Sequence, residues 1–280
     1  ILAATEPDEL RRAVRGWGAA MIVIDQPTDP TAAARALRED EAELLIAALD
    51  PPVPDAAAFD VIVSLFHHGQ CPRPSGEGYY EGCAFAILGE GFAGAAAPRA
   101  SAREAVHDLL VCCGGTDPQR LTGRALQAMA HGLPGAAQVH VVIGPGVEDR
   151  AGIREATARM AMRPRLYEDV QDLSSLMAAC DLAVSSGGTT MMELCCVGTP
   201  AVVIAQTDAE ARFASWFDAQ GAIRYLGGSE AVDERAIRAQ LQRLPEGLRE
   251  GAALSEQLRG LSLSSPLLVS AVQVGEESGR

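Results

Sequence analysis

Short apolar runs alternate with stretches of helical periodicity along most of the chain. The apolar runs, which predict strands, fall at 19–25, 42–50, 59–65, 84–88, 109–113, 139–143, 165–167, 182–185, 201–205 and 223–226. The helical periods fall at 6–17, 30–40, 118–132, 148–160, 173–179, 209–219 and 232–244, with a further helix opening at 187–188. Apolar strands that alternate with helices are typical of parallel sheets covered on both faces. The pattern therefore predicts an α/β protein.

Two breaks in this alternation divide the chain. A Gly/Pro-rich loop covers 67–82, and an Ala/Gly/Pro-rich segment at 91–101 is typical of a linker. A length of 280 residues is enough for about two ordinary domains. We therefore expect two Rossmann-like lobes, residues 1–100 and residues 107–280.

Composition narrows the possible partners. The net charge of -14 argues against a nucleic-acid partner, because a protein that binds the phosphate backbone normally carries a basic face. All 23 basic residues are arginine, and the sequence contains neither lysine nor asparagine, a bias that a GC-rich genome explains. A Schiff-base lysine and a P-loop lysine are therefore excluded. Binding of a small anion is left to backbone amides and arginine.

The cysteines indicate a reducing compartment. Their number, seven, is odd, and most of them lie in apolar stretches, where a free thiol behaves as a small hydrophobe. No Cys-x-x-Cys or Cys/His spacing of a metal site occurs, so we expect no metal and no cofactor. No apolar run approaches the roughly 20 residues of a membrane span, and no signal peptide is evident. These features predict a cytoplasmic protein without stable membrane insertion.

The first candidate site is the glycine-rich turn Gly114-Gly115-Thr116, which follows a predicted strand and precedes a predicted helix. Glycines at such a place let backbone N–H groups approach a phosphate at the positive end of the helix dipole. The alternative is purely structural. The glycines would then make only a tight turn, with Asp117 as the helix cap and Pro118 as the first helical residue.

The second candidate is the stretch Gly187-Gly188-Thr189-Thr190, again after a strand and at the start of a helix. Its amides are suited to a diphosphate, and Glu193, one turn further, is placed to accept hydrogen bonds from two ribose hydroxyls. The alternative is that Thr190-x-x-Glu193 forms a capping box and binds no ligand. Gly144, after a third strand, would leave room for a nucleoside at the same edge of the sheet.

The pair His67-His68 follows an apolar strand and begins the long loop. Either imidazole is a candidate acid/base or phosphate contact, although such a pair is more often part of an ordinary loop. These are the weak catalytic candidates that the residues themselves offer.

Taken together, the glycine loops resemble those of a known family. The second lobe is similar to the C-terminal domain of the UDP-sugar hydrolases of pseudaminic acid biosynthesis. It resembles more distantly the spore-coat polysaccharide proteins and the peptidoglycan N-acetylglucosaminyltransferases. The resemblance covers residues 107–228. The matching stretches are 114–118, 141–144, 176–184, 187–200 with its Gly-Gly-Thr-Thr-x-x-Glu motif, and 225–227.

This resemblance implies a GT-B fold of two Rossmann-like lobes that holds a nucleotide sugar. The implied reaction is metal-free attack of water on the sugar carbon bonded to UDP. By resemblance, the backbone of 187–190 would hold the diphosphate, Glu193 the ribose, and the turn at Asp169-Val170 the uracil.

The chain also departs from the family pattern. Ile1 enters that pattern after the strand, the histidine-bearing loop and the helix with which the family begins, so we expect an incomplete N-terminal lobe. An Asp-His-Tyr-like stretch is replaced by Asp25-Gln26-Pro27, and an Asn-Gln pair is replaced around Ala209-Glu210. An Asp-Gly-x-Gly stretch is not visible in Gly260–Pro266.

Three hypotheses therefore stand at this point. The first is a UDP-sugar hydrolase of nonulosonic acid or surface-polysaccharide biosynthesis. The second is a nucleotide-sugar-binding protein without catalysis. The third is a glycosyltransferase of the same fold, in which a saccharide hydroxyl replaces water. All three share a nucleotide-sugar ligand.

Overall fold

The structure is a computed structural model that describes residues 7–25, 28–50, 55–65, 78–82, 85–95, 106–130 and 138–249. The chain divides into two units, residues 1–86 and residues 87–280, and each is described on its own. The candidates His67 and His68 and the stretch Gly260–Pro266 lie outside the described residues.

Unit 1 is built around a four-stranded parallel sheet with the strand order β1-β2-β3-β4. Its elements are α1 (Pro7–Trp17), β1 (Met21–Asp25), α2 (Thr31–Asp40), β2 (Leu45–Leu49), the 3-10 turn η1 (Ala56–Ala58), β3 (Val61–Ser64) and β4 (Tyr79–Glu81). Ile46 and Ile62 on one face of the sheet pack with Leu37 of α2 and Val14 of α1. Burial of this face explains the apolar residues at alternate positions of these strands.

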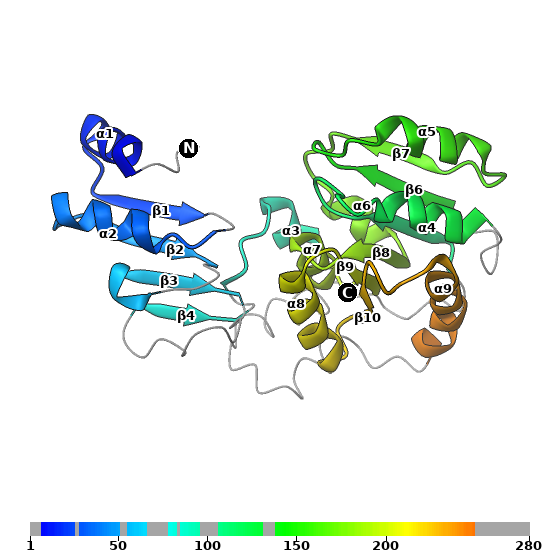
Figure 1. Cartoon of the computed structure of the whole chain (residues 1–280). Coiled ribbons are helices and arrows are strands. Elements are labelled where there is room, and N and C mark those ends of the chain that lie inside the picture. The colour runs from blue at the N-terminus through cyan, green and yellow to red at the C-terminus, as the bar shows by residue number, and fades with distance from the viewer. Residues whose placement is uncertain are drawn as a thin grey trace. The chain divides into compact units, whose positions relative to one another are not determined.

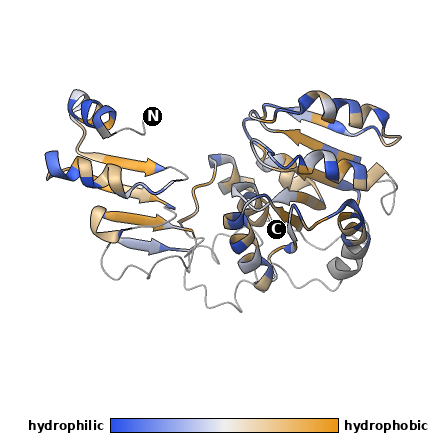
Figure 2. Ribbon diagram, viewed as in Figure 1, coloured by the Kyte–Doolittle hydropathy of each residue, from blue (hydrophilic) through white to orange (hydrophobic). Residues whose placement is uncertain are grey.

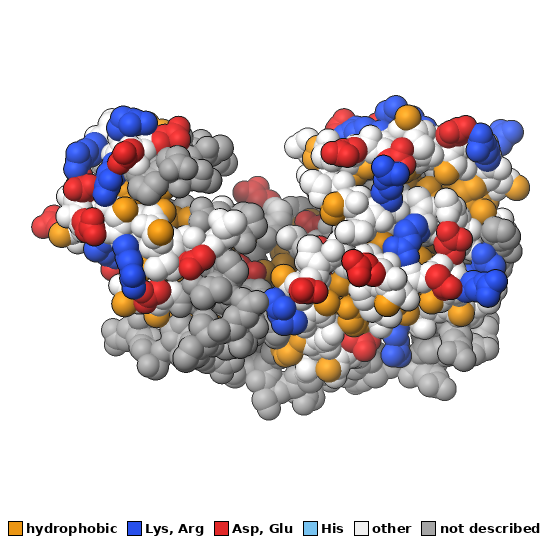
Figure 3. Space-filling model, in the orientation of Figure 1, with side chains coloured by type: hydrophobic (Ala, Val, Ile, Leu, Met, Phe, Trp, Pro, Cys, Tyr) orange, Lys and Arg blue, Asp and Glu red, His pale blue; other side chains and the backbone are white. Residues whose placement is uncertain are grey.

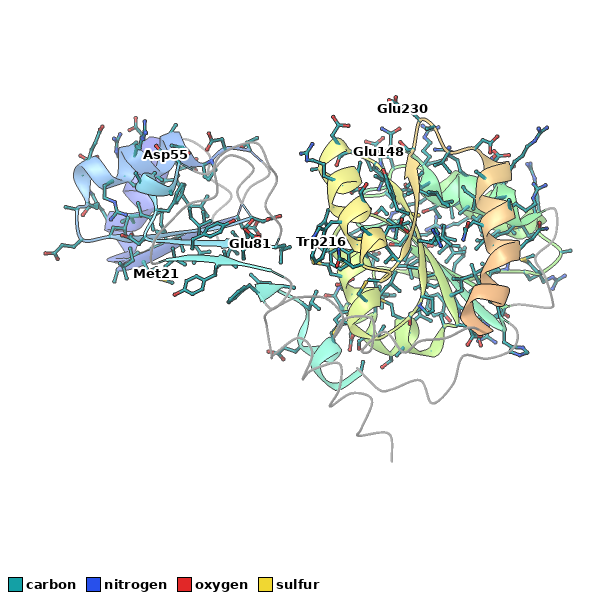
Figure 4. The ribbon with its side chains drawn as sticks, turned by 90° about the horizontal axis from the view of Figure 1, so that it is seen from below. Met21, Asp55, Glu81, Glu148, Trp216 and Glu230 are labelled. Carbon is teal, nitrogen blue, oxygen red and sulfur yellow. The ribbon has the colours of Figure 1, made fainter. Side chains whose placement is uncertain are left out.

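The opposite face of the same sheet is apolar but open among the described residues. Met21, Val23, Leu45 and Tyr80 alternate with the core-facing positions of their strands, and about half of each of these side chains is exposed. Figure 4 shows Met21 on the side of the sheet away from Asp55 and the helices.

Three predictions for residues 67–101 are wrong in the parts that the structure describes. No strand occurs in the described part of 84–88; instead β4 lies inside the predicted loop 67–82 and pairs with β3. A short apolar run forms a strand only where a neighbouring strand offers hydrogen bonds, and β4 occupies that side of β3. The predicted linker 91–101 begins in α3 (Glu90–Ala95), whose Phe92 is buried.

Unit 2 contains a six-stranded, fully parallel sheet with the strand order β10-β9-β8-β5-β6-β7. Its strands are β5 (Asp108–Cys112), β6 (Gln138–Ile143), β7 (Arg165–Glu168), β8 (Leu182–Ser186), β9 (Ala201–Ala205) and β10 (Arg224–Gly228). After α3, its helices are α4 (Leu121–Ala130), α5 (Arg150–Arg159), α6 (Ser174–Ala179), α7 (Thr189–Cys196), α8 (Asp208–Ala219) and α9 (Glu234–Arg249).

Helices cover both faces of this sheet (Figure 1). On one face, Leu126 of α4, Ile153 of α5 and Ile237 of α9 join a core cluster with alternate strand residues. On the other face, α7 packs on β8 and β9, and α8 packs on β9 and β10. Every residue of β8 and β9 is buried, and Figure 2 shows the apolar character of the strands. The prediction of parallel sheets with continuous apolar strands is thus confirmed.

The described helices are too short or too polar to cross a membrane. On the face shown in Figure 3, arginine and carboxylate side chains are interspersed over the described residues rather than segregated by sign.

Candidate functional site

The strand order of unit 2 reverses between β5 and β8. The chain proceeds from β5 through β6 to β7 in one direction, and from β8 through β9 to β10 in the other. The helices that follow these two neighbouring strands therefore lie on opposite faces, and ligands of open α/β sheets bind at such a point, at the carboxyl ends of the strands. The first two predicted glycine loops directly follow β5 and β8. Figure 4 shows Glu148 and Glu230, which follow β6 and β10, at one side of unit 2, the carboxyl edge of the sheet.

The first two loops touch each other at this point. Gly114 has a left-handed backbone, with φ of +88°, and a Cβ atom added there would lie 3.3 Å from Ser186 Oγ. Gly115 has open space around the same position. The loop therefore keeps its backbone close to the start of α7.

The third loop packs directly on the first. A Cβ atom at Gly144 would lie 2.5 Å from the carbonyl oxygen of Gly114 and 2.6 Å from the Cα of Gly115. The amide of Gly146 donates a hydrogen bond of 2.8 Å to the carbonyl of Gly115. Only glycine fits at position 144, and the absence of its side chain lets the loops after β5 and β6 meet.

The helix that follows the second loop has free donors at its start. α7 begins at Thr189 with Gly188 as its N-cap, and no side-chain cap bond occurs there among the described residues. Thr190 is inside the helix, so the capping-box alternative for Thr190 and Glu193 is wrong. The orphan amides of the first turn are therefore available to an anion.

Glu193 lies one turn into α7 and is half-buried. Its carboxylate makes no hydrogen bond or ion pair with any described residue, and burial raises its pKa. The Glu193 charge also acts on Cys112, the last residue of β5. Burial is the main cause that raises the pKa of Cys112 to about 11, and Glu193 adds to the shift. A half-buried carboxylate without a donor is costly to desolvate, so it favours a ligand that brings hydroxyl groups.

Asp117 provides a different cap from the one predicted. α4 begins at Leu121 rather than Pro118, and the Asp117 carboxylate accepts hydrogen bonds from the amides of Leu121 at 2.7 Å and Thr122 at 3.0 Å. The prediction of Pro118 as the first helical residue is wrong because Asp117 to Arg120 form a separate turn, closed by an Arg120 amide bond to the Asp117 carbonyl. Asp117 is buried, and this burial raises its pKa despite the hydrogen bonds.

We expect the substitution Asp117→Ala to lower the free energy of unfolding by about 1–2 kcal/mol, since it leaves two helix amides without their acceptor. Urea unfolding followed by circular dichroism measures this loss. Asp117→Asn keeps one acceptor oxygen and should cost less. Equal stability of wild type and Asp117→Ala would contradict the capping role.

The turn after β7 is tied to the third glycine loop by Arg150, the first residue of α5. Its guanidinium donates to the carbonyls of Gly144 at 3.0 Å and Pro145 at 2.9 Å, and to the Asp169 carboxylate at 3.0 Å. A fourth bond, of 3.2 Å, goes to Glu168. Asp169 has a left-handed backbone, with φ of +52°, and presents the exposed Val170 next to it.

The loop after β9 contacts the loops that follow β5 and β8. Gln206 donates from its side chain to the carbonyl of Cys113 at 3.1 Å and accepts from the amide of Gln119 at 3.2 Å. The Glu210 carboxylate accepts from the amides of Gln206 at 2.7 Å and Gly187 at 3.3 Å. Bonds from this loop and from the first turn of α8 therefore reach Cys113, next to the first glycine pair, and Gly187 of the second.

The structure thus brings together ten sequence-predicted positions around one edge of unit 2. They are Gly114, Gly115, Thr116, Gly144, Val170, Gly187, Gly188, Thr189, Thr190 and Glu193. Sequence reasoning missed Arg150, Gln206 and Glu210 as members of this cluster. Each lies between a strand and a helix or in the first turn of that helix, which was an available signal, because such positions lie at the same edge of a parallel sheet. Among the described residues, no cluster of three or more His, Cys, Asp or Glu side chains is placed to hold a metal.

Comparison with known proteins supports the architecture. The chain is 29% identical over 169 residues to the spore coat polysaccharide biosynthesis protein SpsG of Bacillus subtilis, covering 59% of this chain and 48% of that protein. It is 32% identical over 105 residues to a UDP-N-acetylglucosamine–N-acetylmuramyl-(pentapeptide) pyrophosphoryl-undecaprenol N-acetylglucosamine transferase of Sorangium cellulosum, covering 36% of this chain and 26% of the transferase. No protein-family profile matches the chain.

Solved structures match the fold at low identity. The structure of Acinetobacter baumannii MurG matches with a TM-score of 0.57 and 12% identity, covering 95% of this chain and 77% of that one. The spinosyn rhamnosyltransferase SpnG, complexed with thymidine diphosphate, matches with a TM-score of 0.53 and 17% identity, covering 98% of this chain and 72% of that one. The predicted GT-B-like α/β fold with two parallel sheets is therefore confirmed. The chain is related to SpsG and to the transferase, and spans about half the length of SpsG.

Proposed function

We propose that unit 2 binds the nucleoside diphosphate part of a nucleotide sugar, and that the protein transfers the sugar to a saccharide acceptor in polysaccharide biosynthesis. The observation that carries the proposal is the meeting of three glycine loops at the point where the strand order reverses, beside an uncapped helix and a carboxylate without a donor.

The diphosphate is assigned to the backbone of 187–190. The first-turn amides of α7 supply donors there, and the helix dipole favours negative charge. The loop Gly114-Gly115-Thr116 faces the same space, and the open surroundings of Gly115 leave room for phosphate oxygens. Amides in this position would also stabilise the charge that develops on the leaving diphosphate, which is a common electrostatic device in catalysis.

The nucleoside is assigned to Glu193 and Val170. The Glu193 carboxylate has the acceptor oxygens that two ribose hydroxyls require, and burial strengthens such bonds. Val170 offers an exposed apolar side chain at a turn that Arg150 fixes against the third loop, a surface suited to one face of a base.

The proposal differs from its alternatives in the group that receives the sugar: a saccharide hydroxyl in a transferase, water in a hydrolase, and none in a protein that only binds. The transferase of Sorangium cellulosum carries sugar transfer in its name, and the matched SpnG structure is named a rhamnosyltransferase, which favours an acceptor hydroxyl over water. A UDP-sugar hydrolase of pseudaminic acid biosynthesis and a binding protein without catalysis remain the competing hypotheses. His67 and His68 stay predictions for the proton transfer that either reaction needs.

The test combines calorimetry with product analysis. UDP-N-acetylglucosamine and dTDP-glucose are titrated into the 280-residue chain, and each is then incubated with and without oligosaccharide acceptors while sugars are followed by mass spectrometry. Binding together with an extended saccharide supports the proposal. Free sugar formed without an acceptor favours the hydrolase, and binding without either product favours the non-catalytic hypothesis. Absence of binding to both nucleotide sugars would contradict all three.

A further inference from the structure

The Glu210 side chain lies over the start of α7, where the diphosphate is assigned. Its Oε2 accepts the amide hydrogen of Gly187 at 3.3 Å, and its Oε1 is 3.6 Å from the position of a Cβ atom added to Gly188. The Cβ and the carbonyl oxygen of Glu210 both lie 3.0 Å from the corresponding position on Gly187. The carboxylate is thus held against both glycines of the second loop.

Capping of its own helix explains only part of this arrangement. Thr207 is the N-cap of α8, and its hydroxyl accepts from the Glu210 amide at 3.2 Å. The Glu210 carboxylate in turn accepts from the Gln206 amide at 2.7 Å, which resembles a capping box shifted by one residue. The hydrogen bond from the Gly187 amide does not cap α8, because Gly187 lies just before α7.

We propose that Glu210 is an internal competitor of the ligand, whose ionised carboxylate occupies the Gly187 amide and must be neutralised or displaced before a diphosphate binds. The inference rests on the function proposed above and adds a selectivity residue to that site. Two anions that approach one amide donor repel each other strongly where both are partly desolvated.

The surroundings of Glu210 offer little compensation for its charge. It forms no ion pair with any described residue. The titratable groups that face it are Cys113, after β5, and Tyr225, in β10, and both are neutral near pH 7. Burial is the main cause that raises the pKa of each, and Glu210 adds to both shifts.

The protonation state of the Glu210 carboxyl determines whether ligand affinity rises or falls with pH. Burial raises the pKa of Glu210, although the amides of Gln206 and Gly187 act in the opposite direction. As the pH falls through that raised pKa, the carboxyl takes up a proton and stops competing for the Gly187 amide. Affinity for a diphosphate whose own charge is constant should therefore increase at lower pH.

The probe is UDP-N-acetylglucosamine, or dTDP-glucose if that binds more tightly. Each phosphate of a nucleotide sugar has one ester and one anhydride linkage, so the ligand lacks the terminal phosphate ionisation at about pH 6 that would obscure the measurement with UDP. Calorimetric dissociation constants are measured at about pH 5.5 and about pH 8, because the protonated fraction of the carboxyl is larger at the lower pH. We expect the wild type to bind more tightly at the lower pH.

Two substitutions at the same position separate charge from shape. Glu210→Gln keeps an acceptor oxygen but removes the charge, so it should bind about fivefold to tenfold more tightly at the higher pH and lose the pH dependence. Glu210→Asp keeps the charge and should keep the dependence. The matched control is Glu230→Gln, which removes one exposed carboxylate that follows β10 and should leave the wild-type profile unchanged. Thermal unfolding of each variant verifies that α8 remains folded.

A pH-independent wild type, or a Glu210→Gln variant that binds equally or more weakly, would overturn the inference. The weaker case would mean that Glu210 contacts the ligand directly. These outcomes leave the proposed function intact, because they require measurable binding. If no variant binds either nucleotide sugar at either pH, the proposed function fails, and this inference fails with it.

Discussion

The substitution Gly144→Ala is expected to lower the free energy of unfolding of unit 2 by about 1–3 kcal/mol and to remove most nucleotide-sugar binding. The added Cβ would lie 2.5 Å from the Gly114 carbonyl oxygen and 2.6 Å from the Gly115 Cα, and both atoms belong to the backbone. A flexible side chain can rotate away from such a contact, but the backbone of the loop between β5 and α4 must move as a whole. The first loop would therefore shift away from the diphosphate position.

The control for this prediction is Gly123→Ala in α4. The corresponding Cβ atom meets nothing within 4 Å there, and alanine is a better helix former than glycine. We expect Gly123→Ala to be neutral or to stabilise unit 2 by up to about 1 kcal/mol. Urea unfolding and calorimetry are applied to both variants. If the two behave alike, the close approach of the loops at Gly144 has no energetic consequence.

The second large effect concerns Glu193. We expect Glu193→Ala to weaken binding of a nucleotide sugar by about 1–3 kcal/mol through loss of charge-assisted hydrogen bonds to the ribose. Stability should change little, because α7 has no cap bond from this side chain and the carboxylate has no donor among the described residues. Removal of the half-buried charge can even stabilise the unliganded protein slightly.

Comparison of ribose and deoxyribose sharpens this test. A ligand without the 2′-hydroxyl, such as dUDP-glucose, should bind wild type more weakly than UDP-glucose, and the two should bind Glu193→Ala almost equally. Glu230→Ala is the control for loss of one carboxylate. A dissociation constant that Glu193→Ala does not change would place the ribose elsewhere.

The central strands of unit 2 were predictable from the sequence because they are buried on both faces, and β1 and β2 were predictable because even their open face carries apolar side chains. β8 and β9 consist wholly of buried residues, and such runs stay apolar whatever lies next to them. β4 could not be identified in this way. It is only three residues long, and its pairing with β3 depends on a contact that local periodicity does not encode. Helix α3 could not be predicted, because its alanine-rich and glycine-rich sequence is also typical of a linker.

The glycine part of the site was predictable for a related reason. Carboxyl ends of parallel strands share an edge, so glycines after three strands could be placed together without coordinates. The contacts between the loops could not be predicted from the sequence. Gln206 bonds Cys113 across 93 positions, and Glu210 bonds Gly187 across 23, so their roles depend on tertiary packing. Asp117 differs, because its bond to α4 is local: the sequence indicated its capping role but not the residue at which the helix begins.

The Arg150 bonds have a consequence for the order of events during binding. One guanidinium joins four oxygen acceptors from two loops, so the turn that presents Val170 is already in place before any ligand arrives. The diphosphate end, by contrast, holds a carboxylate that must first give way. A nucleotide sugar would then dock by its base and complete its contacts at the phosphates afterwards. The association rate would then depend mainly on the contacts of the base, and the dissociation rate mainly on the contacts of the phosphates.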